Sequence, residues 1–142
     1  MSRLVDGKYT KPVSLSSGVN TDKYEFNAFV APDESFIIYT SYGREDDLGG
    51  GDLYISYKDE NDNWTSAKNL GKEINSNRID YCPFLDVKTN TLYFTSEKST
   101  VKTSFSSQKS IEELKDALKR GPNGLGKLYK VTISTMLERK RD

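Results

Sequence analysis

The chain consists of short runs of aromatic and β-branched residues separated by turn residues. Such runs predict strands, because a strand points successive side chains to opposite faces and favours these residue types. Segments rich in Pro, Gly, Asp and Asn lie between the runs and predict turns. The expected strands lie near 25–30, 36–41, 52–57, 64–70, 80–85, 91–96 and 127–134. The pattern therefore predicts an all-β fold.

The sequence also repeats itself. Sliding the chain along itself aligns residues 8–41 with residues 63–96, at an offset of 55 (84 − 29). The aligned pairs include Tyr9 with Trp64, Leu15 with Leu70, Val19 with Ile74, Asn20 with Asn75, Glu25 with Asp80, Phe29 with Phe84 and Thr40-Ser41 with Thr95-Ser96. The segment GDLYIS at 51–56 then recurs as GKLYKV at 126–131, so the offset has grown to 75 (126 − 51). The second copy therefore carries an insertion.

The repeat divides the chain into two units of one domain. Blade unit A covers about 16–71, and blade unit B covers about 72–134, with an insertion at 97–125. Unit B lacks a fourth strand of its own, and the N-terminal residues 8–15 match the missing one. We therefore expect residues 8–15, or a neighbouring chain, to complete unit B. Four-stranded repeats of this length predict β-propeller blades.

The motifs of unit A also suggest a family. NAFVAPDESFIIYTS, GGGDLYIS and NWTSAKNLGKEINS resemble the WD-like β-propeller repeat of the Pro-Asp type, found in TolB-like proteins. Unit B departs from that pattern, with Val87-Lys88 in place of Pro-Asp and Lys127 in place of the Asp before Leu-Tyr. The resemblance implies a six-bladed ring used mostly as a platform for binding, and a periplasmic or otherwise exported location in a bacterium.

Two blades do not close a ring. The chain is therefore expected to be a piece of a larger propeller, a protomer of which three copies assemble, or a stand-alone pair of blades. A lone pair exposes two sheet faces and unpaired edges, which proteins normally avoid.

Composition excludes several classes of function. The 142 residues carry 21 Lys+Arg and 21 Asp+Glu, so the formal net charge is zero and no nucleic-acid partner is expected. Histidine is absent, which excludes His-based catalysis and His-ligated zinc, and a single Cys excludes an internal disulfide. No apolar run is long enough to cross a membrane. No metal or other cofactor is expected.

Glu25 and Asp80 are the leading candidates for ligand binding. They occupy equivalent places at the start of the innermost strand, near the mouth of a propeller channel. Carboxylates there suit hard cations or sugar hydroxyls. The alternative is that both cap loop amides between blades.

A second acidic group lies in the loop from Arg44 to Gly51. Asp46 and Asp47 suggest a calcium loop, but the alternating ligand spacing and the terminal Glu are missing. A solvated hairpin explains the same residues. We expect Asp52 to be a structural hydrogen-bonding residue and Cys82, opposite Asn27 in the repeat, to be a buried inert thiol.

The insertion predicts a short helix. Ser110 and Glu113 form a capping-box pattern, and Gly121-Pro122 ends the helix. Its apolar residues share one face and must dock on something. The helix either covers its own blade edge or the ring's mouth, or serves as a lid or as an element that docks a partner. These candidate docking residues are Ile111, Leu114 and Leu118, with Phe105 in the preceding loop.

The leading expectation for function is a non-catalytic scaffold that binds a protein or small ligand on its loop faces. One alternative is a carbohydrate-active propeller that uses channel carboxylates such as Glu25 and Asp80. A lectin-like oligomer that binds a glycan between blades is another alternative.

Overall fold

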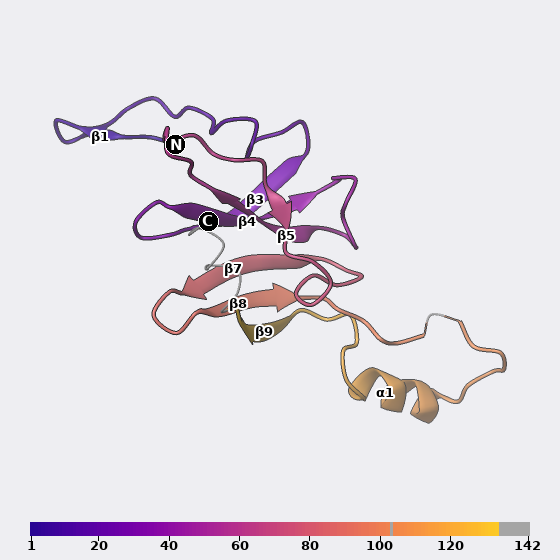
Figure 1. Cartoon of the computed structure of the whole chain (residues 1–142). Helices are drawn as coiled ribbons and strands as arrows, with labels where there is room; N and C mark the ends of the chain where they lie inside the picture. Colours follow the sequence, from indigo (N-terminus) through magenta and orange to yellow (C-terminus); the bar gives the residue numbers. More distant parts are fainter. Residues whose placement is uncertain (103, 134–142) are drawn as a thin grey trace.

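The computed structural model describes residues 1–102 and 104–133, and in them the fold is all-β with one short helix (Figure 1). Three antiparallel sheets form, with strand orders β1-β2, β3-β4-β5-β6 and β7-β8-β9. The strands are β1 (Leu4–Val5), β2 (Lys8–Tyr9), β3 (Tyr24–Val30), β4 (Phe36–Tyr42), β5 (Asp52–Tyr57), β6 (Lys68–Asn69), β7 (Asp80–Asp86), β8 (Thr91–Ser96) and β9 (Lys127–Thr132). The helix α1 spans Ile111–Lys119.

The strands expected from the sequence form, with small differences at their ends. The expected strand at 64–70 is shorter, because only β6 pairs with β5 as a strand, and Trp64 adds an isolated bridge to Lys58. The expected end of the last strand at Ser134 lies outside the described residues. In the structure, unit A denotes the β3–β6 sheet and unit B the β7–β9 sheet, without the segments that flank each sheet in the two blade units.

The two units carry a β-bulge at matching positions. The pairing of β3 with β4 shifts register between Phe26 and Phe29, and the pairing of β7 with β8 shifts 55 positions later. Asn27 (φ 50°) and Cys82 (φ 52°) occupy the same place within these bulges, both in the left-handed region. The expectation of a buried thiol was wrong, because the bulge leaves Cys82 exposed.

The N-terminal residues do not complete unit B within this chain. Instead, β2 pairs with β1 in a separate hairpin, which projects at one end of the molecule (Figure 1). Residues 16–18 contact the outer part of unit A, where Ser16 Oγ donates to the carbonyl of Trp64 (3.2 Å) and Ala67 N donates to the carbonyl of Gly18 (3.1 Å). In the described residues, β9 pairs with β8 alone.

The main core lies between the two units. One face of the unit A sheet packs on one face of the unit B sheet, and the linker after β6 lies between them. The buried side chains of this seam include Ile38, Leu53, Ile55, Leu70, Ile74, Leu85, Leu92 and Phe94. The opposite face of unit A carries a second, smaller cluster of Val19, Ile37, Tyr39 and Tyr54.

The insertion projects from the body as an arm (Figure 1). Ser110 caps α1 as predicted, since its side chain accepts from Glu113 N and the Glu113 carboxylate accepts from Ser110 N. Nevertheless, α1 packs against no strand of the described chain, and none of its residues is buried. None of the helices in the described residues has the length and apolar character needed to span a membrane.

Candidate functional site

The predicted pair of carboxylates holds two equivalent turns. Glu25 Oε2 accepts a hydrogen bond from Thr21 N (3.2 Å), and Asp80 Oδ2 accepts one from Ser76 N (2.6 Å). Each carboxylate lies at the start of the innermost strand of its unit. The turn before it also matches, because two successive N–H groups donate to one carbonyl, that of Ser16 before unit A and that of Gly71 before unit B. The amide-capping alternative therefore describes what these two side chains do in the structure.

Glu25 is also neutralised by a neighbour. Arg44 Nη2 lies 3.4 Å from Glu25 Oε1, and the two side chains are only 15% and 10% exposed. The guanidinium also donates to Ser41 Oγ (2.8 Å) and stacks over the Tyr54 ring, 4.7 Å from its centroid. It donates to the Tyr39 hydroxyl as well (3.0 Å). Glu25 is therefore part of a packed polar cluster.

Asp80 is 0% exposed and forms no ion pair among the described residues. Burial raises the pKa of its carboxyl above the ordinary 3.8, although hydrogen bonds from Ser96 and Ser76 oppose that shift. Its Oδ1 has no hydrogen-bond partner among the described residues. The backbone of Asp80 lies at the seam, since Asp80 N donates to the carbonyl of Gly51 (2.8 Å). This burial leaves Asp80 no surface on which to meet a sugar.

The acidic loop is organised by its own carboxylates. Asp47 Oδ2 accepts from Gly43 N (2.6 Å) and Arg44 N (3.1 Å). The Tyr54 hydroxyl lies 2.8 Å from Asp46 Oδ1 and 2.7 Å from Asp47 Oδ1, and burial together with both carboxylates raises the pKa of Tyr54. No group of three metal-ligating side chains occurs in the part of the chain described. The two aspartates thus shape the loop around Tyr54.

Asp52 has the structural role expected of it. Its Oδ2 accepts from Leu48 N (2.8 Å) and from Asn69 Nδ2 (2.7 Å), which ties the loop to β6. Burial raises the pKa of this carboxyl too, and the nearby charges of Asp47 and Asp80 add to that shift.

The helix presents the predicted apolar stripe to solvent. Ile111 is 66%, Leu118 48% and Leu114 39% exposed. Phe105 does not join this stripe. It lines a hollow of about 390 Å³ on another side of the helix, with Lys109, Glu113, Asp116, Ala117 and Arg120. The stripe therefore has no cover within the described chain.

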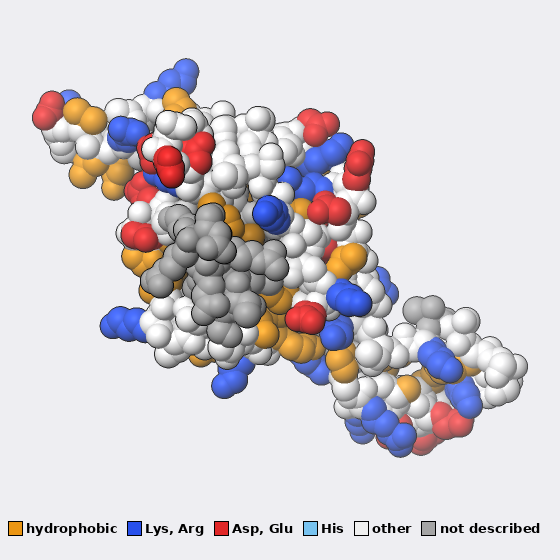
Figure 2. All heavy atoms as spheres, viewed as in Figure 1, with side chains coloured by type: hydrophobic (Ala, Val, Ile, Leu, Met, Phe, Trp, Pro, Cys, Tyr) orange, Lys and Arg blue, Asp and Glu red, His pale blue; other side chains and the backbone are white. Residues whose placement is uncertain are grey.

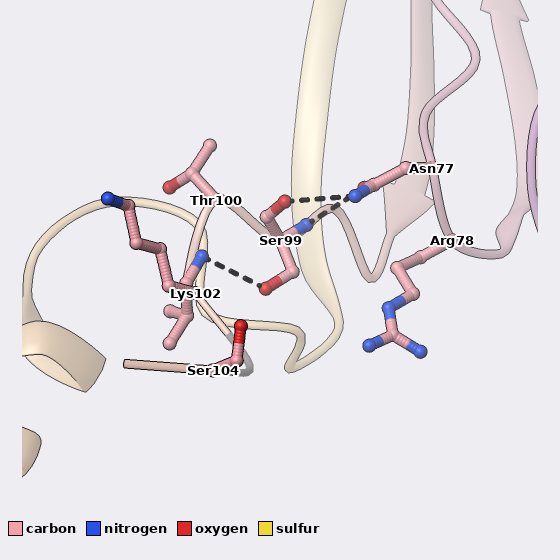
Figure 3. A pocket seen from close by; sticks show the side chains of 7 residues that line it. Asn77, Arg78, Ser99, Thr100, Lys102 and Ser104 are labelled. Carbon is pink, nitrogen blue, oxygen red and sulfur yellow. Dashed lines mark hydrogen bonds between the residues drawn. The ribbon is translucent and has the colours of Figure 1, made fainter. Parts of the chain in front are cut away.

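A basic hollow lies where the arm leaves the body. It has a volume of about 540 Å³ and is lined by Asn77, Arg78, Ser99, Thr100, Val101, Lys102 and Ser104. Asn77 holds its wall, since its side chain bonds both the N–H and the carbonyl of Ser99 (3.3 and 3.1 Å). Figure 3 places the Arg78 guanidinium and the Lys102 ammonium at opposite ends, with hydroxyl groups between them. Neither cation has an ion-pair partner in the described residues.

The surface around these features is mixed in charge. Figure 2 shows lysine, arginine and acidic side chains scattered over the visible face, including the arm. The basic hollow was missed in the sequence analysis, because Arg78 and Lys102 belong to segments that no motif connects. Arg44 was missed as the partner of Glu25 for the same reason.

Comparison with known proteins adds no relative. No match is found to a family model, to a curated protein or to a solved structure. The resemblance to the WD-like repeat therefore stays a prediction from the sequence.

Proposed function

We propose that the chain is a non-catalytic binding module, built from WD-like propeller blades, that docks a protein partner through its arm. The observation that carries the proposal is the uncovered stripe on α1. A nine-residue helix is marginal in isolation, yet this one has a complete capping box and three apolar side chains on one face. The cap holds the stripe in a geometry that fits a partner's groove.

The residues of the stripe have the spacing of a helical recognition motif. Ile111, Leu114 and Leu118 are spaced i, i+3 and i+7, as in helices that lay an apolar face into a groove. Uncovered apolar side chains on a projecting element are a mark of an interaction site. The matching partner surface is an apolar groove on another protein.

The basic hollow indicates a second property of the partner, namely acidic residues beside its apolar groove. Arg78 and Lys102 lie at the base of the same arm with no acidic side chain in the hollow's lining. Figure 3 draws the two charged groups at opposite ends of the hollow, which favours an extended acidic rim beside the apolar groove over one compact anion.

The state of the carboxylates supports a non-catalytic role. A glycosidase needs two accessible carboxyl groups that flank the scissile bond. Here Glu25 is paired with Arg44, and Asp80 is buried with its Oδ2 on a backbone amide. Glu25 lines an open hollow of about 230 Å³, but the described lining of that hollow contains no second carboxyl group to act with it.

The test is to isolate the partner and map its contact with α1. The immobilised chain is used to capture proteins from cells of its source, and the captured protein is purified and titrated by calorimetry. The variant I111E/L118E should weaken binding at least about tenfold, because it places charges in the apolar contact. The control Asp116→Lys, on the opposite side of α1, should bind as the wild type does. Equal affinity for all three chains overturns the proposal.

A further inference from the structure

We propose that the chain associates head to tail with a second copy of itself, through a contact that repeats the seam between its own two units. The contact uses the outer face of unit A in one copy and, in the next copy, the edge of β9 that pairs with no other strand of the described residues. This inference rests on the blade arrangement of the proposed function, but not on the partner of the arm.

One amide side chain joins the linker to unit A at the seam inside the chain. Asn75 Oδ1 accepts from Leu53 N (2.8 Å), and Asn75 Nδ2 donates to the carbonyl of Leu53 (3.0 Å). The same carbonyl accepts from Leu70 N (3.0 Å). Thus the linker that precedes unit B clamps the backbone of β5 in unit A, and the Leu53 side chain is 0% exposed beneath it.

The linker half of this clamp recurs at the head of the chain. Asn20 occupies the place of Asn75 and ends the same turn, in which Val19 N and Asn20 N donate to the carbonyl of Ser16 (2.9 and 3.0 Å). Asn20 Oδ1 accepts from Leu15 N (2.8 Å), and its Nδ2 has no partner within the described residues. Asn20 is exposed, so this head clamp is free to reach another chain.

The strand half of the clamp recurs at the tail. Leu128 pairs with Thr95 across the sheet as Leu53 pairs with Thr40. Backbone groups alternate in direction along a strand, so the matched register points the N–H and carbonyl of Leu128 toward the open edge of β9. In the described residues, these groups have no partner.

The side chains at the two ends correspond to those that meet in the seam. Leu128 is 73% exposed, whereas its counterpart Leu53 is fully buried in the seam. The outer face of unit A has an open hollow of about 230 Å³, whose lining includes Leu15, Val19, Asn20, Ile37 and Tyr39. The counterparts of these five are Leu70, Ile74, Asn75, Leu92 and Phe94, which surround or clamp Leu53 inside the chain. Among the described residues, Leu128 thus projects without a cavity to enter, and no side chain fills the hollow on unit A.

Such a contact is heterologous, because it joins two different surfaces. It forms a ring if the rotation that relates successive copies returns the last copy to the first, and a filament if it does not. Three copies would supply the six blades that the family resemblance implies. The formal net charge of zero places no overall repulsion between copies.

Light scattering behind a sizing column tests the inference. We expect a wild-type mass near three times the 16.1 kDa of one chain. Leu128→Asp and Asn20→Ala should each lower the mass to that of one chain, with the circular dichroism spectrum unchanged. Leu125→Asp, at an equally exposed position just before β9, should keep the wild-type mass. A wild-type mass of one chain at every concentration overturns the inference.

Cross-linking gives a second readout in a Cys82→Ala background. The variant N20C/L128C should form disulfides between copies, whereas N20C/V87C should form none. Absence of cross-linked copies in both variants overturns the head-to-tail contact. A chain that stays single yet binds its partner through α1 overturns this inference and leaves the proposed function intact.

Discussion

Glu25 and Asp80, 55 positions apart, hold the same turn in the two repeats, because each carboxylate accepts the backbone N–H four residues before it. The hydroxyl groups around them also correspond. Ser41 Oγ donates to Glu25 (3.4 Å), and Ser96 hydrogen bonds Asp80. What differs is the charge nearby. Glu25 has Arg44, whereas the position that matches Arg44 in unit B is Ser99.

This difference predicts that Arg44 stabilises unit A through several contacts at once. Arg44→Ala leaves the nearly buried Glu25 without a counter-charge and removes the cation from the Tyr54 ring. We expect the free energy of unfolding to fall by about 3 kcal/mol. Urea denaturation monitored by Trp64 fluorescence measures the change.

A double-mutant cycle separates the ion pair from the packing. Glu25→Gln should cost less than Arg44→Ala, and Arg44→Ala should cost less in a chain that already carries Glu25→Gln. Arg44→Lys keeps the charge but loses the planar guanidinium that stacks on Tyr54. Its loss of unfolding free energy should therefore lie between those of Glu25→Gln and Arg44→Ala. Additive effects would show that Arg44 acts through packing alone.

The repeat made much of this arrangement predictable. Because Asp80 and Glu25 align, the sequence places both at the same strand start, and the alternation of residues locates β3 to β5 and β7 to β9 closely. Ser110 and Glu113 likewise define where α1 begins. Each of these features depends on local chemistry or on a match between two segments of the chain.

Other features depend on contacts between segments that no pattern relates. The N-terminal segment 8–15 was expected in unit B, but β2 pairs with β1, and Leu15 packs against the cluster around Tyr39 in unit A. The similarity of residues 8–15 to the outer strand of unit A predicts that they fit the outer edge of a blade. It does not predict which of the two units they join. Similarly, the uncovered state of α1 depends on where its arm projects, which its amphipathic pattern does not specify.

The matched bulges at Asn27 and Cys82 predict opposite effects on stability when each residue is replaced by the other. Asn adopts the left-handed region more readily than other residues with a β-carbon, whose cost there is about 1–2 kcal/mol. Cys82 is exposed, so Cys82→Asn should raise the free energy of unfolding by about 0.5–1 kcal/mol without loss of packing. Asn27→Cys should lower it similarly. Equal stability of both variants and the wild type in thermal melts would contradict the strain argument.

Burial of Asp80 predicts a particular dependence of stability on pH. Its pKa is raised in the folded chain, so the carboxyl holds its proton more tightly there than in the unfolded chain. The contribution of Asp80 to the free energy of unfolding is therefore complete below pH 3.8 and is lost as the pH rises through the folded pKa. Asp80→Asn cannot ionise, so its stability relative to the wild type should increase with pH over that window, by about 1.4 kcal/mol per unit of pKa elevation.

The matched control has the opposite sign. A hydrogen bond from the Thr89 side chain, with support from the Lys88 and Thr89 backbone, holds the pKa of Asp86 below its usual value. The contribution of Asp86 to stability is present above pH 3.8 and is lost as the pH falls through the folded pKa. Asp86→Asn should therefore lose stability relative to the wild type as the pH rises. Parallel pH profiles for the two variants, measured by chemical denaturation, would refute this assignment.

Neighbouring glycines in the acidic loop predict a sharp contrast. A β-carbon on Gly49 would lie 2.5 Å from the carbonyl oxygen of Arg78 and 2.6 Å from its nitrogen, so the backbone of one segment must move. On Gly50 the nearest atom would be 3.6 Å away, at the nitrogen of Ile79, which is ordinary contact. Gly49→Ala should therefore destabilise the chain by about 1–3 kcal/mol, whereas Gly50→Ala should change its stability little.

The same substitution links the loop to the proposed binding surface. Arg78 and Asn77 line the basic hollow, and Asn77 bonds Ser99 at the start of the arm. A shift of residues 77–78 by a β-carbon on Gly49 therefore displaces both the cation and the wall. Gly49→Ala should weaken partner binding under conditions where the chain is fully folded, and Gly50→Ala should not. If both bind as the wild type does, calorimetry with the purified partner would exclude the hollow from the contact and leave α1 as its remaining element.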